Sequence, residues 1–421
     1  MSVLIGGGLW LASLVNAGKV SRPFEPTPTP TRTIQSYLSE GDQNFQDGML
    51  DDAVGAYLNA VAADSANVQL RVELARVMVY SSAGLTTDIQ RRERLREAES
   101  MIEQAIQLNP DHSNAHAVRA LALDWLSVLE PAEREALLTQ ASDAAVRALQ
   151  LNPANPLAQA FYAEVLADQQ KWAQALNAAR RAVELDPDKM DVHRTYGYVL
   201  ESNGAYQEAI EEYQKALEIN PRLGFIYVSI GQNYRKLGDS DRALEAFDQA
   251  SKLNKEDVLP YLAIARTYYQ LGEYFIAARN LEKALELDNT NPDIYGRLGL
   301  VYFHGKNYEG AMIELRCAVH GCQHDDPRAT PEADPIPQVE VPGQALSTTS
   351  LEYYYTLSSV LAALSDPARG INYCPEARPI LNQIEAFAPD DLTVISIVAE
   401  NRNICDQVEG RATAPQVTPT P

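Results

Sequence analysis

The feature that most constrains the fold of this chain of 421 residues is an internal repeat with a period of 34 residues. Five consecutive segments align without gaps, and they start at Tyr162, Tyr196, Ile230, Ile264 and Leu298. A period of about 20 to 50 residues is typical of architectures in which each repeat is one supersecondary unit that buries its apolar face against its neighbours. The chain is therefore predicted to form a repeat solenoid.

Small residues recur at three phases of this repeat. They are Ala163, Gly197, Gly231, Ala265 and Gly299 in the first series, Ala175, Ala209, Ala243, Ala277 and Ala311 in the second, and Ala182, Ala216, Ala250, Ala284 and Ala318 in the third. Large apolar residues such as Tyr213 and Phe247 recur between them at helical spacing. Because only a small side chain lets two helices approach closely, each unit is predicted to be two antiparallel helices joined by a turn such as Asn203-Gly204.

These segments resemble the tetratricopeptide repeat family, whose pattern joins an early Leu-Gly, a Tyr three positions later, paired alanines and a closing proline, here Pro187 and Pro221. The resemblance is most regular from Pro156 to about residue 325. The weaker units are one that starts at Leu38, two with insertions at residues 81–92 and 127–136, and a ninth helical pair after residue 347. The resemblance implies an all-α, right-handed superhelical solenoid of about nine helix-turn-helix units with a C-terminal capping helix.

The predicted organisation has six segments. They are an apolar signal peptide or membrane anchor (1–18), a Pro/Thr-rich linker (19–33), a solenoid of eight units of which the second and third carry insertions (34–325), a Pro-rich break (326–347), a ninth helical pair with the capping helix (348–410) and a disordered tail (411–421). The N-terminal run is short for a membrane span but fits the apolar segment of a signal peptide.

The location of the protein depends on that N-terminal run. It is uncharged, which favours export, but no basic residue precedes it and Lys19 and Arg22 follow it, opposite to the usual orientation bias. We expect an extracytoplasmic protein that is membrane-anchored or secreted, of the bacterial exported or membrane-anchored type. The alternative is a cytoplasmic protein with an apolar end.

Composition and motifs argue against two classes of function. Asp and Glu number 57 against 35 Lys and Arg, and the resulting net charge of −22 would repel nucleic acid. The sequence contains no GxSxG, no HExxH, no Walker-type Gly-Lys loop and no GxGxxG after a strand. Nearly all of the chain is assigned to repeats, which leaves no segment large enough for a catalytic domain. The chain is therefore predicted not to be an enzyme and to bind no cofactor.

The four cysteines all lie in the C-terminal third. They are Cys317, Cys322, Cys374 and Cys405. An even number in a chain predicted to be exported favours two disulfides, and of the three possible pairings we favour Cys317 with Cys322 and Cys374 with Cys405. Cys317, Cys322 and the nearby His320 and His324 form an alternative zinc ligand set. Structural zinc sites usually draw two ligand pairs from separated segments, so we predict no metal site.

In the family that the chain resembles, the first helices of successive repeats line a concave groove that binds peptides or protein segments. The corresponding groove positions here are Arg194, Tyr198, Phe225, Val228, Gln232, Arg235, Leu262, Arg266, Tyr269, Arg297, Leu300 and Phe303. Aromatic residues and Arg dominate the set, as in interface hot spots, although any single ring could instead pack between repeats. The Lys and Asn positions of the family's chaperone-tail clamp hold other residues, which argues against that kind of receptor.

The predicted function is therefore a non-catalytic interaction scaffold that binds a peptide or protein segment of unknown identity in this groove, with no nucleic-acid partner. The alternative is an accessory or substrate-recruiting arm of a multi-protein enzyme or of a secretion or envelope assembly machine.

Overall fold

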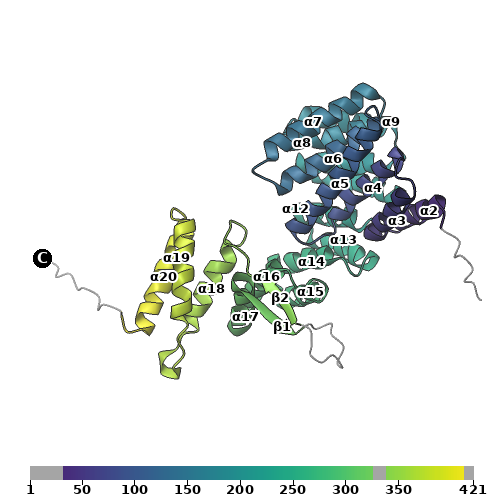
Figure 1. Ribbon diagram of the computed structural model, residues 1–421. Coiled ribbons are helices and arrows are strands. Elements are labelled where there is room, and N and C mark those ends of the chain that lie inside the picture. The colour runs from purple at the N-terminus through teal and green to yellow at the C-terminus, as the bar shows by residue number, and fades with distance from the viewer. Residues whose placement is uncertain (1–31, 326–337, 412–421) are drawn as a thin grey trace, which may run out of the picture.

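The computed structural model describes residues 32–325 and 338–411 (Figure 1). The predicted apolar segment 1–18, most of the linker 19–33 and most of the tail 411–421 therefore lie outside the described residues. So does the part of the Pro-rich break from 326 to 337. No helix in the described ranges is long and apolar enough to cross a membrane.

The described residues form 19 α-helices, which follow one another as nine consecutive pairs and one final helix. The pairs are α2 (Ile34–Gln46) and α3 (Leu50–Ala63), α4 (Val68–Ser82) and α5 (Asp88–Leu108), α6 (Ser113–Leu129) and α7 (Arg134–Leu151), α8 (Pro156–Asp168) and α9 (Trp172–Leu185), α10 (Met190–Ser202) and α11 (Tyr206–Ile219), α12 (Gly224–Lys236) and α13 (Ser240–Leu253), α14 (Val258–Gln270) and α15 (Tyr274–Leu287), α16 (Pro292–His304) and α17 (Tyr308–His320), and α18 (Leu351–Ala363) and α19 (Cys374–Phe387). A short 3₁₀ helix, η1 (Pro367–Arg369), lies between α18 and α19.

The final helix α20 (Leu392–Val408) packs against α18 and α19 and buries Val394, Val398 and Cys405 there. It covers the apolar face that the ninth pair would otherwise leave exposed, as a terminal repeat requires. The predicted all-α solenoid with a capping helix is confirmed.

Local signals set the ends of the helices. Asn155 and Asn291 each accept a hydrogen bond from a backbone N–H in the first turn of the helix that follows, and proline occupies the first helical position. The turn inside each regular unit needs one residue with positive φ. Gly204, Gly238 and Gly272 provide it at φ between 78° and 83°, 34 residues apart. The period is therefore visible in the backbone conformation as well as in the side chains.

The small residues of the repeat lie where paired helices touch. A Cβ added to Gly231 would lie 2.4 Å from the Phe247 ring, and one added to Gly197 would lie 2.8 Å from the Tyr213 ring. The alanines of the second and third series are fully buried. The large side chain of one helix thus occupies the space that the missing side chain of the other leaves open, as the sequence pattern predicts.

The superhelix turns far enough to bring distant units into contact. Arg222, after α11, donates through Nε to the carbonyl oxygen of Asp47, at the turn of the first unit, over 3.2 Å. Farther inside, Arg76 of α4 forms a salt bridge of 2.8 Å with Asp191 of α10, 115 residues later. Figure 1 shows the result as a rounded body that contains α3 to α13, with α16 to α20 extending away from it.

A two-stranded hairpin, which the sequence did not lead us to expect, accompanies the helices. β1 (Gly321–Asp325) pairs antiparallel with β2 (Gln338–Pro342). Val339 and Val341 of β2 are buried and pack with Tyr295, Cys317 and neighbouring apolar residues of the eighth unit. Their alternation with exposed residues is the period of a strand, but it spans too few residues inside a Pro-rich stretch to stand out in the sequence.

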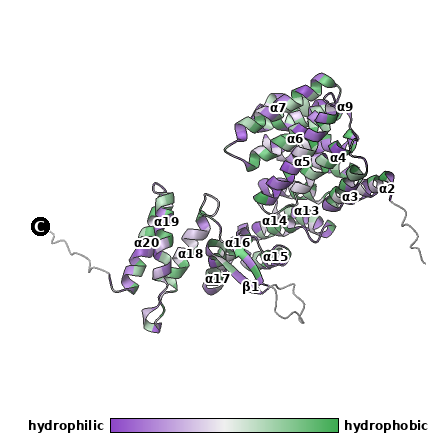
Figure 2. Cartoon of the chain, in the orientation of Figure 1, coloured by the Kyte–Doolittle hydropathy of each residue, from purple (hydrophilic) through white to green (hydrophobic). Residues whose placement is uncertain are grey.

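Hydrophobic and hydrophilic residues lie side by side along the helices in Figure 2. This is the pattern of amphipathic helices that bury one face against the next unit.

Candidate binding cleft

A cleft of about 1210 Å³ lies along the first helices of the third to eighth units, from α6 to α16. Nine of the predicted groove residues line it. They are Arg194, Tyr198, Phe225, Val228, Gln232, Arg235, Leu262, Arg266 and Arg297. The 34-residue phase thus places them along one continuous surface. Whether they contact a partner stays a prediction.

Three predicted groove residues lie apart from this cleft, at the ends of α14 and α16. Leu300 is buried among residues of the ninth pair. Tyr269 and Phe303 both pack edge-to-face against His304, with ring centroids 5.4 and 5.3 Å away. The two rings therefore belong to an aromatic cluster between the seventh and eighth units.

At the end of the cleft near α6, α8 and α10, a buried ion pair connects α8 to α10. Arg194 donates through Nη2 to Glu164 of α8, and both side chains are almost fully buried. Glu164 also accepts from the Thr195 hydroxyl at 2.6 Å and from Trp125 Nε1 at 3.3 Å. Burial by itself lowers the pKa of Arg194, but the adjacent Glu164 carboxylate outweighs it and raises the pKa. Arg194 is thus paired within the protein, so its guanidinium holds α8 to α10.

Glu164 was not among the predicted site residues, although it lies one repeat before Tyr198 at the same phase. Extending the mapping to α8 would have found it.

Two carboxyl groups, those of Asp124 and Asp168, line the same end of the cleft. Asp124 is 1% exposed, and its Oδ1 has no hydrogen-bond partner within the described residues. Burial raises the pKa of Asp124, and the neighbouring Asp168 carboxylate adds to that effect. Burial also raises the pKa of Asp168, against the hydrogen bond of 2.8 Å that it accepts from the Tyr198 hydroxyl. This end of the cleft therefore carries less negative charge than two exposed aspartates would.

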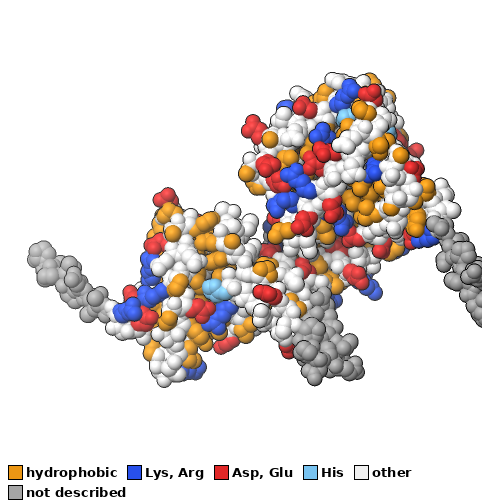
Figure 3. All heavy atoms as spheres, viewed as in Figure 1, with side chains coloured by type: hydrophobic (Ala, Val, Ile, Leu, Met, Phe, Trp, Pro, Cys, Tyr) orange, Lys and Arg blue, Asp and Glu red, His pale blue; other side chains and the backbone are white. Residues whose placement is uncertain are grey.

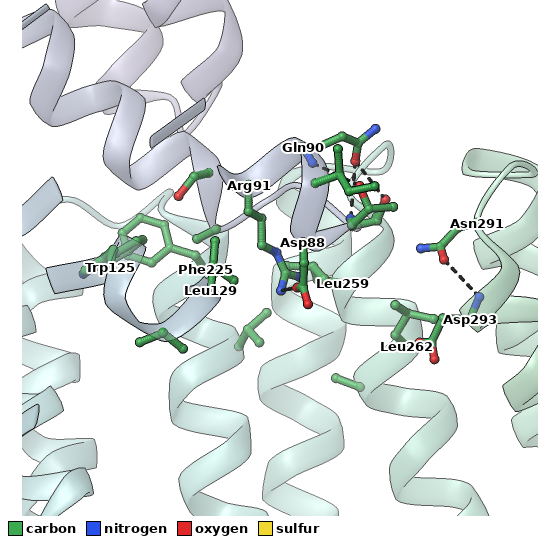
Figure 4. Close-up of a pocket in the computed structure, with 18 of the residues that line it drawn as sticks. Asp88, Gln90, Arg91, Trp125, Leu129, Phe225, Leu259, Leu262, Asn291 and Asp293 are labelled. Atoms are coloured by element: carbon green, nitrogen blue, oxygen red, sulfur yellow. Dashed lines mark hydrogen bonds and ion pairs between the residues drawn. The ribbon is translucent and has the colours of Figure 1, made fainter. Parts of the chain in front are cut away.

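The insertion of the second unit forms one wall of the cleft. Residues 82–83 and 86–91, which run from the end of α4 into the first turn of α5, are among its lining. Thr86 hydrogen-bonds to Asp288 of the seventh unit. In Figure 4, Asp88 and Arg91 project into the cleft between Phe225 and Leu262. The sequence located the insertion but contained no signal for this position.

The charges that line the cleft are unevenly paired. Arg91 Nη1 lies 3.4 Å from Asp88 Oδ1, and Arg297 donates through Nε to Asp293 Oδ2 at 2.6 Å. Arg235 of α12 and Arg266 of α14, by contrast, have no hydrogen-bond or ion-pair partner in the part of the chain that the structure describes. Burial lowers the pKa of Arg235, and the nearby positive charge of Arg266 lowers it further. On the molecular face seen in Figure 3, acidic and basic side chains are interspersed.

Both disulfides have the favoured pairing, Cys317 with Cys322 and Cys374 with Cys405. The first closes a short loop where α17 meets β1, and the second joins the start of α19 to α20. Because both sulfurs of the first pair are bonded to each other, they are not arranged as zinc ligands. In the described residues, no group of three or more His, Cys, Asp or Glu side chains is placed to hold a metal ion.

Family models match three stretches of the chain. Residues 163–223 and 226–257 match models described as tetratricopeptide repeat, and residues 265–305 match one described as TPR repeat. These stretches lie where the 34-residue period is most regular, and they contain seven of the nine predicted groove residues that line the cleft. No curated protein matches the chain.

Three solved structures show what the chain is similar to. The crystal structure of MamA has 21% identity and a TM-score of 0.33, covering 39% of this chain and 95% of that one. The APC/C hetero-tetramer Cut9–Hcn1 has 13% identity and a TM-score of 0.48, covering 94% and 81%. PilF of Pseudomonas aeruginosa has 19% identity and a TM-score of 0.38, covering 47% and 88%. All three TM-scores are below 0.5, so the fold assignment rests on the helix pairs and on the family matches.

Proposed function

This chain is a tetratricopeptide repeat protein, and we propose that it is a non-catalytic scaffold that binds an extended peptide or protein segment in the cleft lined by α10, α12 and α14. The observation that carries the proposal is that one sequence phase, followed from unit to unit, leads to side chains that line a single cleft. Tyr198, Gln232 and Arg266 occupy the same phase in three consecutive units. A surface built in this way has regularly spaced positions that suit a chain in extended conformation.

The composition of the cleft supports this function. Phe225 and Leu262 are half-buried, so each still offers apolar surface to a ligand. Arginine side chains lie next to them, and this combination of rings, aliphatic groups and guanidinium groups is the one enriched in interface hot spots. The walls are helices packed against neighbouring units, so a partner would meet a surface that is largely organised before binding.

A photo-crosslinking experiment in the native host tests this proposal. A photoreactive amino acid replaces Gln232 in the cleft, and a matched variant carries it at Gln174, which is exposed on the second helix α9. We expect a discrete crosslinked protein from position 232 that is absent from position 174. Identical products from both positions, or products from position 174 alone, would contradict binding in the cleft.

We also propose that the protein works in an oxidising compartment outside the cytoplasm. The support for this is the pairing of all four cysteines, since disulfides persist mainly in secreted and extracytoplasmic proteins. A non-reducing peptide map of protein from its native source is expected to contain both linked peptide pairs. Four free thiols in that map would place the protein in a reducing compartment.

A further inference from the structure

We infer that the segment bound in the cleft carries an acidic side chain, Asp or Glu, whose carboxylate docks between Arg235 and Arg266. The inference rests on the proposed function, because it specifies the partner of the same cleft.

The first argument comes from the charges of the cleft. Five arginines line it, and four aspartates line it with them. Three of the arginines already have carboxylate partners, namely Asp88, Glu164 and Asp293. Only Arg235 and Arg266 are left without a partner in the described residues, and they belong to neighbouring first helices. The surplus positive charge is therefore confined to one place.

The second argument is that this pair costs stability in the free protein. Arg235 is half-buried, and burial together with the nearby positive charge of Arg266 lowers its pKa. The chain has 57 acidic residues, so pairing both arginines internally would need only a suitably placed Asp or Glu. Unfavourable charge arrangements of this kind concentrate at binding sites, where a ligand relieves them.

Structural roles explain only part of this arrangement. Arg235 lies in the last turn of α12, where the helix dipole favours a cation, and its guanidinium lies 5.9 Å from the Phe247 ring. Arg266 has neither feature, since it lies inside α14 and its side chain is exposed. Its position beside Arg235 is therefore explained by a ligand better than by the fold.

A carboxylate is the anion that fits. Two guanidinium groups can each donate two parallel N–H bonds to carboxylate oxygens, and the half-buried setting of Arg235 strengthens its bonds. Val228 and Leu262 line the same cleft, so apolar side chains accompany the two arginines there. The remaining lining includes Asp88 and Asp293, which would repel a polyanion such as nucleic acid. A single acidic residue in an otherwise apolar or neutral segment avoids that repulsion.

A selection experiment with the full-length, disulfide-bonded protein tests the inference. Random peptides fused at their C-termini to the display scaffold offer side-chain carboxylates but no free C-terminal one. They are selected on the wild-type protein, on the double charge reversal R235E/R266E and on the control R181E. Arg181 is exposed on α9, and its ion-pair partner in the described residues is Glu184, at 3.0 Å.

The inference predicts an Asp or Glu at a fixed distance from an apolar or aromatic anchor in peptides selected by the wild type and by R181E. The charge reversal should select Lys or Arg at that position. Changing the selected acid to its amide is expected to weaken binding to the wild type on the order of tenfold or more, and to weaken binding to R266Q by a clearly smaller factor, because only Arg235 then remains to bind the carboxylate. Because Arg266 is exposed, R266Q provides this readout even if the double variant does not fold.

The outcomes separate the two proposals. Cleft-binding peptides without acidic enrichment would overturn the inference and leave the proposed function standing. Binding peptides that are unaffected by replacing Phe225 and Leu262 with alanine would show that the cleft is not the site, and both proposals would fail. The same preference for acidic peptides in the wild type and in R235E/R266E would also refute the role of the arginine pair.

Discussion

Replacing Glu164 by Leu is expected to destabilise the protein by about 3–5 kcal/mol, because it leaves Arg194 as a buried cation without a carboxylate partner. In the wild type, the Glu164 side chain is 1% exposed and that of Arg194 is 6% exposed. At an effective dielectric constant of about 20, opposite charges at contact attract by roughly 4 kcal/mol, which offsets much of the cost of burying them. That attraction is lost in E164L, while the burial of the Arg194 guanidinium remains.

The double variant E164L/R194M separates this electrostatic effect from simple loss of packing. It removes both charges and keeps side chains of similar size, so the desolvation cost disappears together with the attraction. What remains lost are the hydrogen bonds that Glu164 accepts from Thr195 and Trp125, and the stacking of the Arg194 guanidinium near the Tyr80 and Trp125 rings, at 5.3 and 5.7 Å, worth about 0.5–2 kcal/mol. The double variant should thus be more stable than E164L, with a coupling energy of about 2 kcal/mol or more.

Urea unfolding followed by circular dichroism measures the stability of both single variants and the double variant. Hydrogen exchange of α8 and α10 then localises the effect, since repeat proteins can open unit by unit. The exposed pair Arg181–Glu184 is the matched control, and R181M/E184L should change stability by about 0–1 kcal/mol. If the losses of E164L and R194M simply add in the double variant, the ion pair does not connect α8 to α10 as described.

Three further predictions follow from other parts of the molecule. Replacing Cys374 and Cys405 by alanine removes a disulfide that closes a loop of 31 residues. Thermal unfolding should show the ninth unit destabilised by about 3–4 kcal/mol, and a change confined to the N-terminal units would contradict this. Gly231→Ala should lower the free energy of unfolding by about 1–3 kcal/mol, because the added Cβ would lie 2.4 Å from the Phe247 ring. Gly231 is inside helix α12, so the substitution does not also force a positive φ on alanine, as it would at the turn residue Gly204. Unchanged stability in urea unfolding would refute the close approach. Burial raises the pKa of Glu314 to about 7, so the folded state favours the protonated carboxyl. The stability linked to this protonation is fully present below pH about 4.5, near the pKa of an unfolded Glu, and is lost as pH rises through about 7. The wild type should therefore lose more stability than E314Q between pH 5 and pH 8, and parallel pH profiles of the two unfolding midpoints would contradict the shift.

The helix pairs could be predicted from the sequence because their determinants are local and periodic. The positions of Gly197 and Gly231 follow from the 34-residue spacing alone, and the rings that cover them follow from the same phase. The same periodicity identified most of the cleft residues, since equivalent positions on stacked helices must lie on one surface. The cysteine pairing was also accessible, because Cys317 and Cys322 are only five residues apart.

The parts that escaped prediction depend on contacts between distant or irregular segments. Each unit is rotated slightly relative to the one before it, and the accumulated rotation brings Arg76 and Asp191 into contact. No local sequence pattern specifies the total rotation. Insertions interrupt the phase, so the fold of residues 82–91 into the cleft could not be read from the repeat.

The sequence by itself determined the repeating unit, its tight helix contacts and the face that each first helix turns inward, because those properties depend on side-chain size and period. Only the tertiary structure decided which inward side chains are available to a partner. Arg194 and Arg266 look alike as arginines on first helices, yet the fold buries one against Glu164 and leaves the other exposed in the cleft. The physical reason is that burial and charge pairing are set by neighbours far away in the sequence, such as Asp191 for Arg76, 115 residues apart, which the local period does not specify.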